Sequence, residues 1–97
     1  MNESVAEVKA MKKMEFTENQ VTSLLPILKD CMTDQFHDYL TSLITHSECG
    51  IAFQDIIDTV INCKISISKE EYERFVIAGE LMNRDPKILL GLKELII

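Results

Sequence analysis

The stretch IAFQDIIDTVIN, residues 51–62, decides the fold class of this chain. Residues three and four apart lie on the same side of an α-helix. One side of the stretch is apolar and the other polar, with Phe53, Ile56, Ile57, Val60 and Ile61 on the first and Asp55, Asp58, Thr59 and Asn62 on the second. The pattern predicts a helix that buries one face in a core.

Two more helices follow this stretch toward the C-terminus. Residues 64–67 predict a short extended connection, and Ser68-Lys69-Glu70-Glu71 then matches a capping box, the pattern that opens a helix. That helix is expected to end near Asn83. Asp85-Pro86 predicts a restart, because Asp is a favoured N-cap and Pro fits the first turn of a helix.

Toward the N-terminus the helix boundaries depend on capping residues and on Pro26. Capping boxes at Ser4 and Thr17 predict one short helix to about Met14 and a second after Thr17. Pro26 either kinks that second helix or restarts the chain with Pro26 in a first turn. We expect a helix over 26–45, either continuous or broken at Thr33, and a turn over 46–50.

These elements predict an all-α fold, a compact bundle of about four to five short helices in a single domain, 1–97. Residues 1–16 have little apolar content and are expected to be frayed or ordered only by a partner. Only three Gly and two Pro occur, too few for the turns of a β-sandwich or barrel. No run reaches the length of about 20 apolar residues that spans a bilayer, and no signal peptide opens the chain, so a cytoplasmic location is expected.

Side chains with catalytic or metal-binding chemistry are few and scattered. Cys31, Cys49 and Cys63 form no CxxC pair, so they are interpreted as reduced, apolar packing residues. His37 and His46 each have only one potential ligand three residues away, and a metal needs three or four. The three glycines are isolated, and Gly79 and Gly91 are expected to permit close helix packing. We therefore expect no enzyme activity, no cofactor and no metal.

The net charge of -6 is concentrated in the middle of the chain. Residues 15–62 hold eight acids against Lys29 alone, whereas the charges of residues 63–97 balance. A nucleic-acid binder needs clustered bases, so direct nucleic-acid binding is not expected. An acidic surface instead attracts basic proteins, although it can also serve solubility alone. No membrane contact is expected, and the sequence does not predict the oligomeric state.

Seven residues of this acidic half are candidates for partner binding. Asp30, Asp34 and Asp38 recur every four residues and share one face if the helix is continuous there. Asp55 and Asp58 lie on the polar face of the next helix, which a short turn makes an antiparallel neighbour. Tyr is enriched at binding hot spots, which favours Tyr39, although a core-edge position fits it equally well. The candidates are Asp30, Asp34, Asp38, Tyr39, Glu48, Asp55 and Asp58.

Four short motifs in residues 48–95 carry a family resemblance. They are, in order, Glu48-Cys49-Gly50-Ile51-Ala52-Phe53, Ile65-Ser66-Ile67-Ser68-Lys69-Glu70-Glu71-Tyr72, Gly79-Glu80-Leu81-Met82 and Asp85-Pro86. In this order and spacing they resemble the MafI-type immunity proteins, CdiI-like antidotes of contact-dependent growth inhibition and polymorphic toxin systems. The chain departs from that pattern at Ile88-Leu89, where an aromatic residue is usual, and residues 1–45 match no family motif.

The resemblance implies that the chain binds and neutralises a cognate bacterial toxin domain. Many such toxins are nucleases, so the expected partner is a basic nuclease domain, an RNase in the sharpest form of the hypothesis. The residues alone leave a second hypothesis open, a small helical regulatory adaptor that binds a transcription or signalling protein through an apolar groove.

Overall fold

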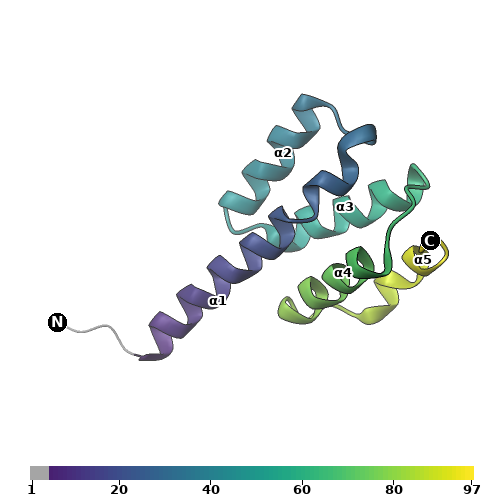
Figure 1. Cartoon of the computed structure of the whole chain (residues 1–97). Helices are drawn as coiled ribbons and strands as arrows, with labels where there is room; N and C mark the ends of the chain where they lie inside the picture. Colours follow the sequence, from purple (N-terminus) through teal and green to yellow (C-terminus); the bar gives the residue numbers. More distant parts are fainter. Residues whose placement is uncertain (1–4) are drawn as a thin grey trace.

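A computed structural model describes residues 5–97, with side chains from Lys12 onward (Figure 1). The described residues contain five α-helices and two 3-10 helices, which confirms the predicted all-α bundle. The elements in chain order are α1 (Val5–Thr22), η1 (Leu25–Cys31), α2 (Asp34–Thr45), α3 (Cys49–Asn62), α4 (Lys69–Leu81), η2 (Pro86–Leu89) and α5 (Leu90–Lys93).

Helix α3 is the centre of the bundle, and α1, α2, η1 and α5 all pack against it. Its predicted apolar face is buried at Ala52, Phe53, Ile56, Ile57 and Val60. The ring of Phe53 meets Phe75 of α4 with their centroids 6.1 Å apart. Truncating a buried Phe to Ala costs about 3–5 kcal/mol, so this contact is a large part of the stability of a domain this small.

Helix α1 is a single helix where two were predicted. Thr17 does not cap a new helix; its hydroxyl donates to the carbonyl of Lys13 at 2.8 Å, which is the back-bonding of a Thr inside a helix. No Gly or Pro separates the two predicted segments, so nothing interrupts the helix. The capping box at Ser4 lies outside the described residues. The first turns of α1 extend beyond the other helices (Figure 1).

The chain restarts at Pro26 and breaks again before Thr33, so the helix predicted over 26–45 is two elements. Pro26 lies in the first turn of η1, one of the two outcomes predicted for it. Met32 ends η1 in an extended conformation, and the Thr33 side chain accepts from the backbone N–H of Phe36 at 3.1 Å. This N-cap opens α2, and η1 and α2 therefore follow separate axes.

Three helices end in the same way, with a non-glycine residue in the left-handed conformation. Ser47, Lys64 and Asn83 have φ values of 63°, 51° and 54° and follow α2, α3 and α4. After α3, the N–H of Ile65 donates back to the carbonyl of Val60 at 3.0 Å, which closes a Schellman motif. The predicted turn over 46–50 is shorter than expected, because α3 already begins at Cys49.

The C-terminal elements follow the prediction closely. The Ser68 capping box is present in both directions, with Ser68 Oγ accepting from the Glu71 N–H and Glu71 Oε1 accepting from the Ser68 N–H. Asp85 caps η2 by accepting from the N–H of Lys87 at 2.9 Å. The extended residue Ile67 pairs with Ile96 in an isolated parallel bridge. Within residues 5–97, no helix is both long and apolar enough to cross a membrane.

Candidate functional site

The acidic surface is defined here as the six predicted carboxylates together with Tyr39, and α2 and α3 carry most of it. Asp34, Asp38 and Tyr39 lie on α2, Asp55 and Asp58 on α3, Glu48 at the N-cap of α3, and Asp30 on η1. Five of the carboxylate side chains are exposed, and only Asp55 is half-buried.

Tyr39 and Asp55 join the two helices of the acidic surface. The Tyr39 hydroxyl donates to Oδ2 of Asp55 at 2.9 Å. The Tyr39 ring stacks on Phe36 one turn earlier, with their centroids 6.0 Å apart, and remains 46% exposed. The hydrogen bond to Asp55 raises the pKa of Tyr39, and desolvation and the Asp55 charge act in the same direction. Tyr39 is therefore an oriented, solvent-facing aromatic beside a carboxylate.

Asp58 is held by a separate chain of hydrogen bonds that begins at Arg84. The Arg84 guanidinium donates to the carbonyl of Gly50 at 3.0 Å and to Oε1 of Gln54 at 2.7 Å. The amide of Gln54 donates in turn to Oδ1 of Asp58 at 3.1 Å. Arg84 thus ties the segment after α4 to α3 and orients one acid of the acidic surface without forming an ion pair with it.

Asp30 does not share a face with Asp34 and Asp38, because the break at Met32–Thr33 places it on η1. The predicted line of three acids on one helix is therefore wrong, and only Asp34 and Asp38 keep that spacing. Glu48 precedes Asp55 by seven positions, about 10 Å along a helix axis. The structure thus brings Tyr39 and Asp55 into contact and leaves Glu48 near the α2–α3 turn.

Among the side chains of residues 12–97, no Lys or Arg forms an ion pair with the acids of this surface. Among the side chains of residues 12–97, the one ion pair joins His37 and Asp38 at 3.9 Å, and it holds charge only when the His is protonated. Asp38 is 86% exposed in that pair. Exposed carboxylates without partners keep their full charge available to a ligand, whereas paired ones do not.

The described residues contain no group of three or more metal ligands. The ring of His46 lies against the carbonyl of Ser42 at 2.7 Å, where it caps the end of α2. The prediction that the cysteines pack inside is wrong for Cys31 and Cys63, which are exposed. Cys49 is half-buried against the core, and its burial, together with the nearby Glu18 charge, raises its pKa.

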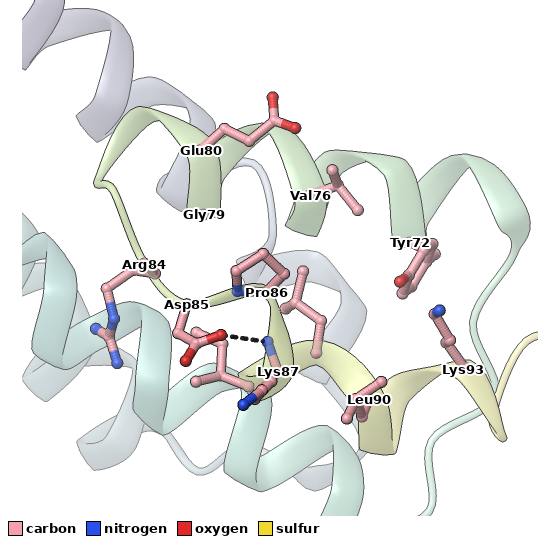
Figure 2. A pocket seen from close by; sticks show the side chains of 12 residues that line it. Tyr72, Val76, Gly79, Glu80, Arg84, Asp85, Pro86, Lys87, Leu90 and Lys93 are labelled. Carbon is pink, nitrogen blue, oxygen red and sulfur yellow. Dashed lines mark hydrogen bonds between the residues drawn. The ribbon is translucent and has the colours of Figure 1, made fainter.

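A pocket of about 290 Å³ lies between α4 and the η2–α5 segment, and no residue of the acidic surface lines it (Figure 2). Val76 and Gly79 line it from α4, and Pro86 and Leu90 line it from the opposite side. Tyr72 and Lys93 line one end of the pocket (Figure 2), and Leu90 is 56% exposed. The sequence pattern did not reveal this pocket, because the two segments that line it restart independently at Ser68 and Asp85.

No protein-family model, curated protein or solved structure matches the chain. The class of the protein is therefore defined by its fold alone, a small all-α bundle, and its candidate site by the charge and geometry of the acidic surface.

Proposed function

We propose that this chain is an immunity protein that binds a cognate bacterial toxin domain through its acidic surface and neutralises it. The toxin we propose is a basic nuclease domain and, more specifically, an RNase. The chain would act by binding alone, without catalysis or a cofactor.

The observation that carries the proposal is the set of exposed, unneutralised carboxylates on neighbouring helices. Asp34, Asp38 and Asp58 are all exposed, and no Lys or Arg of residues 12–97 lies within ion-pairing distance of them. Clustered like charges cost stability when they have no counter-charge, so a basic partner would relieve them. A nuclease presents such a basic surface where it grips phosphate.

Tyr39 adds an ordered aromatic contact to the charges of the acidic surface. Its ring is held on one side by Phe36 and at its hydroxyl by Asp55. An aromatic side chain that is ordered before binding loses little entropy when the complex forms. We therefore place the interface around Tyr39 and Asp55, with Asp34, Asp38 and Asp58 around it, and Asp30 and Glu48 at its margin.

The resemblance of residues 48–95 to MafI-type immunity proteins supports the same class of partner. The four resembling motifs fall at the start of α3, at the Ser68 capping box, at the end of α4 and at η2, which build the core and the helix ends. The acidic α2 lies before them in the chain. The proposed recognition surface thus combines α2, which lies outside the resembling motifs, with the polar face of α3, which belongs to the helical support of residues 48–95.

Co-expression with the toxin encoded immediately upstream tests the proposal. We expect the two proteins to co-purify and cells expressing the toxin to survive only when this chain is present. Tyr39→Ala should weaken binding by about tenfold or more, the loss typical of a hot-spot aromatic. The matched control is Ile77→Ala on α4, which is exposed to nearly the same degree, 44% against 46%. No complex and no protection would overturn the proposal.

The apolar pocket favours a second candidate function, a regulatory adaptor that binds a helix of a transcription or signalling protein. The exposed Leu90 and the half-buried Val76 offer the apolar contact that such binding uses. This candidate predicts binding that is insensitive to salt and lost in Leu90→Asp, with Tyr39→Ala unchanged. The proposed immunity function predicts the opposite for both variants and a strong dependence on salt.

A further inference from the structure

Two exposed cysteines lie at the ends of two elements that pack together. Cys31 is the last residue of η1, and Cys63 is the C-cap of α3. Both are free thiols, and η1 packs directly on α3. They are 32 positions apart in sequence, and the segment between them contains α2 and α3.

The register of the two elements explains why these thiols meet. In a 3-10 helix, residues three apart eclipse one another, so Cys31 lies on the same face of η1 as Leu28. In α3, Cys63 lies three residues beyond Val60 and follows the same stripe. Leu28 and Val60 are both fully buried members of one core cluster. Each cysteine therefore continues a buried apolar stripe to the point where the core ends and solvent begins.

The side chains of Cys31 and Cys63 lie close enough for Cys63 to raise the pKa of the Cys31 thiol. This contact needs no ordered loop or additional residue, since each cysteine stands at the end of a packed helix. Cys49, the third cysteine, lies at the start of α3 and forms its hydrogen bond with the carbonyl of Ile44 instead.

We propose that Cys31 and Cys63 are a modification site, a dithiol pair that forms a reversible disulfide by exchange with a low-molecular-weight disulfide such as oxidised glutathione. The proposal does not depend on the toxin partner. It concerns the covalent state of the chain itself, and it holds or fails whether or not the acidic surface binds a nuclease.

The exchange proceeds in two steps that balance. One of the two thiolates attacks a sulfur of glutathione disulfide, which forms a mixed disulfide and releases one glutathione thiolate. The other thiolate then attacks the protein sulfur of that mixed disulfide, which closes the protein disulfide and releases the second glutathione. The protein loses the protons and electrons of two thiols, and glutathione disulfide is reduced to two glutathiones.

The purified full-length chain in glutathione buffers tests this proposal. In the Cys49→Ser variant, we expect oxidised glutathione to remove both remaining thiols together, with a digested fragment that joins Cys31 to Cys63. The midpoint of thermal unfolding should then rise by more than about 5 °C and return on reduction, because the bridge closes a long loop of the unfolded chain.

Cys31→Ser and Cys63→Ser are the matched controls, and circular dichroism should show both folded, because both positions are exposed. Oxidised glutathione should leave the Cys31→Ser variant as a stable mixed disulfide at Cys63. Separate glutathione adducts at Cys31 and Cys63 in the Cys49→Ser variant, a bridge that forms only in denaturant, or a lower unfolding midpoint after bridging would each overturn the proposal.

Discussion

The hydroxyl of Tyr39 donates a 2.9 Å hydrogen bond to Oδ2 of Asp55, 16 positions later in the sequence. This contact joins α2 to α3 within the acidic surface, and the turn that begins at His46 connects the two helices. It fixes the orientation of an aromatic side chain that stays exposed to solvent. Phe36 stacks against the ring and completes its placement.

The Tyr39–Asp55 hydrogen bond predicts a pH dependence at alkaline pH. In a Tyr72→Phe background Tyr39 is the only tyrosine left. We expect the midpoint of its titration to lie above the ordinary tyrosine value of about 10. In Asp55→Ala the midpoint should fall toward that value, because both the acceptor and the neighbouring charge are gone. The ultraviolet absorbance of tyrosinate measures both midpoints.

The sign of the stability effect follows from linkage. The pKa of Tyr39 is raised in the folded state, so its contribution to stability is complete below about pH 10 and is lost as pH rises through the raised pKa. The free energy of unfolding of Tyr39→Phe should therefore differ from that of the wild type by more near neutral pH than at strongly alkaline pH. Equal midpoints for the Tyr39 titration with and without Asp55 would show that the contact does not persist in solution.

Charge reversal on α2 tests the role of the acidic surface in association. If the proposed toxin is the partner, Asp34→Lys with Asp38→Lys should slow association with it by about tenfold or more, because electrostatic complementarity acts mainly on the association rate. The wild-type rate should fall as salt increases, since screening weakens long-range attraction. Stopped-flow mixing at several salt concentrations measures these rates.

The matched control for charge reversal is Glu73→Lys with Glu94→Lys, which changes the net charge equally at exposed positions outside the acidic surface. If recognition occurs at α2, the control slows association much less than the α2 variant does. Equal effects of the two variants would show that the overall charge of the chain determines the association rate and that the interface lies elsewhere.

Periodicity was sufficient to predict the fold class and the buried face of α3. Phe53, Ile56 and Val60 recur at helical spacing without interruption, so only one assignment fits them. The boundaries before Pro26 were wrong because Thr17 serves equally well as an N-cap or as a back-bonded residue inside a helix, and the local sequence does not distinguish these roles.

The candidate site was predictable only in part, because its contacts cross between elements. The Tyr39–Asp55 contact follows from two antiparallel neighbours, but which residues pair depends on register. Arg84 bonds to residues 30 and 34 positions earlier, and no local pattern marks it. The exposure of Cys31 and Cys63 was missed because free cysteines are usually buried, and both stand where the core ends.

Gly79 and Gly91 look alike in sequence but predict opposite effects when replaced by alanine. A Cβ at Gly79 would lie 3.7 Å from the Phe53 ring, which is ordinary contact, so close packing does not require Gly there. Gly79→Ala should therefore stabilise the fold by about 0.5–1 kcal/mol through helix propensity. A Cβ at Gly91 would lie 2.8 Å from Cδ1 and 3.3 Å from Cγ1 of Ile61, so Gly91→Ala should destabilise it by about 1 kcal/mol.

Urea denaturation of both variants measures these changes in the free energy of unfolding. Ile61→Val removes Cδ1, the nearest clashing atom, so Gly91→Ala should cost less in that background than in the wild type. A stabilising Gly91→Ala in the wild-type background would show that α5 shifts away from Ile61 at little cost.

The left-handed backbone at Lys64 predicts that replacing this residue with glycine stabilises the fold. Its φ of 51° is one that a side chain disfavours, and it follows the C-cap of α3 as the left-handed residue of a Schellman motif. Lys64→Gly relieves this strain, whereas Lys64→Ala keeps a Cβ there and removes the same amine. Glycine should therefore be more stable than alanine by about 1 kcal/mol, a difference that urea denaturation measures directly. Equal stability of the two variants would mean that residue 64 does not hold the left-handed conformation in solution, and the closure of α3 by the Ile65–Val60 hydrogen bond would then need another explanation.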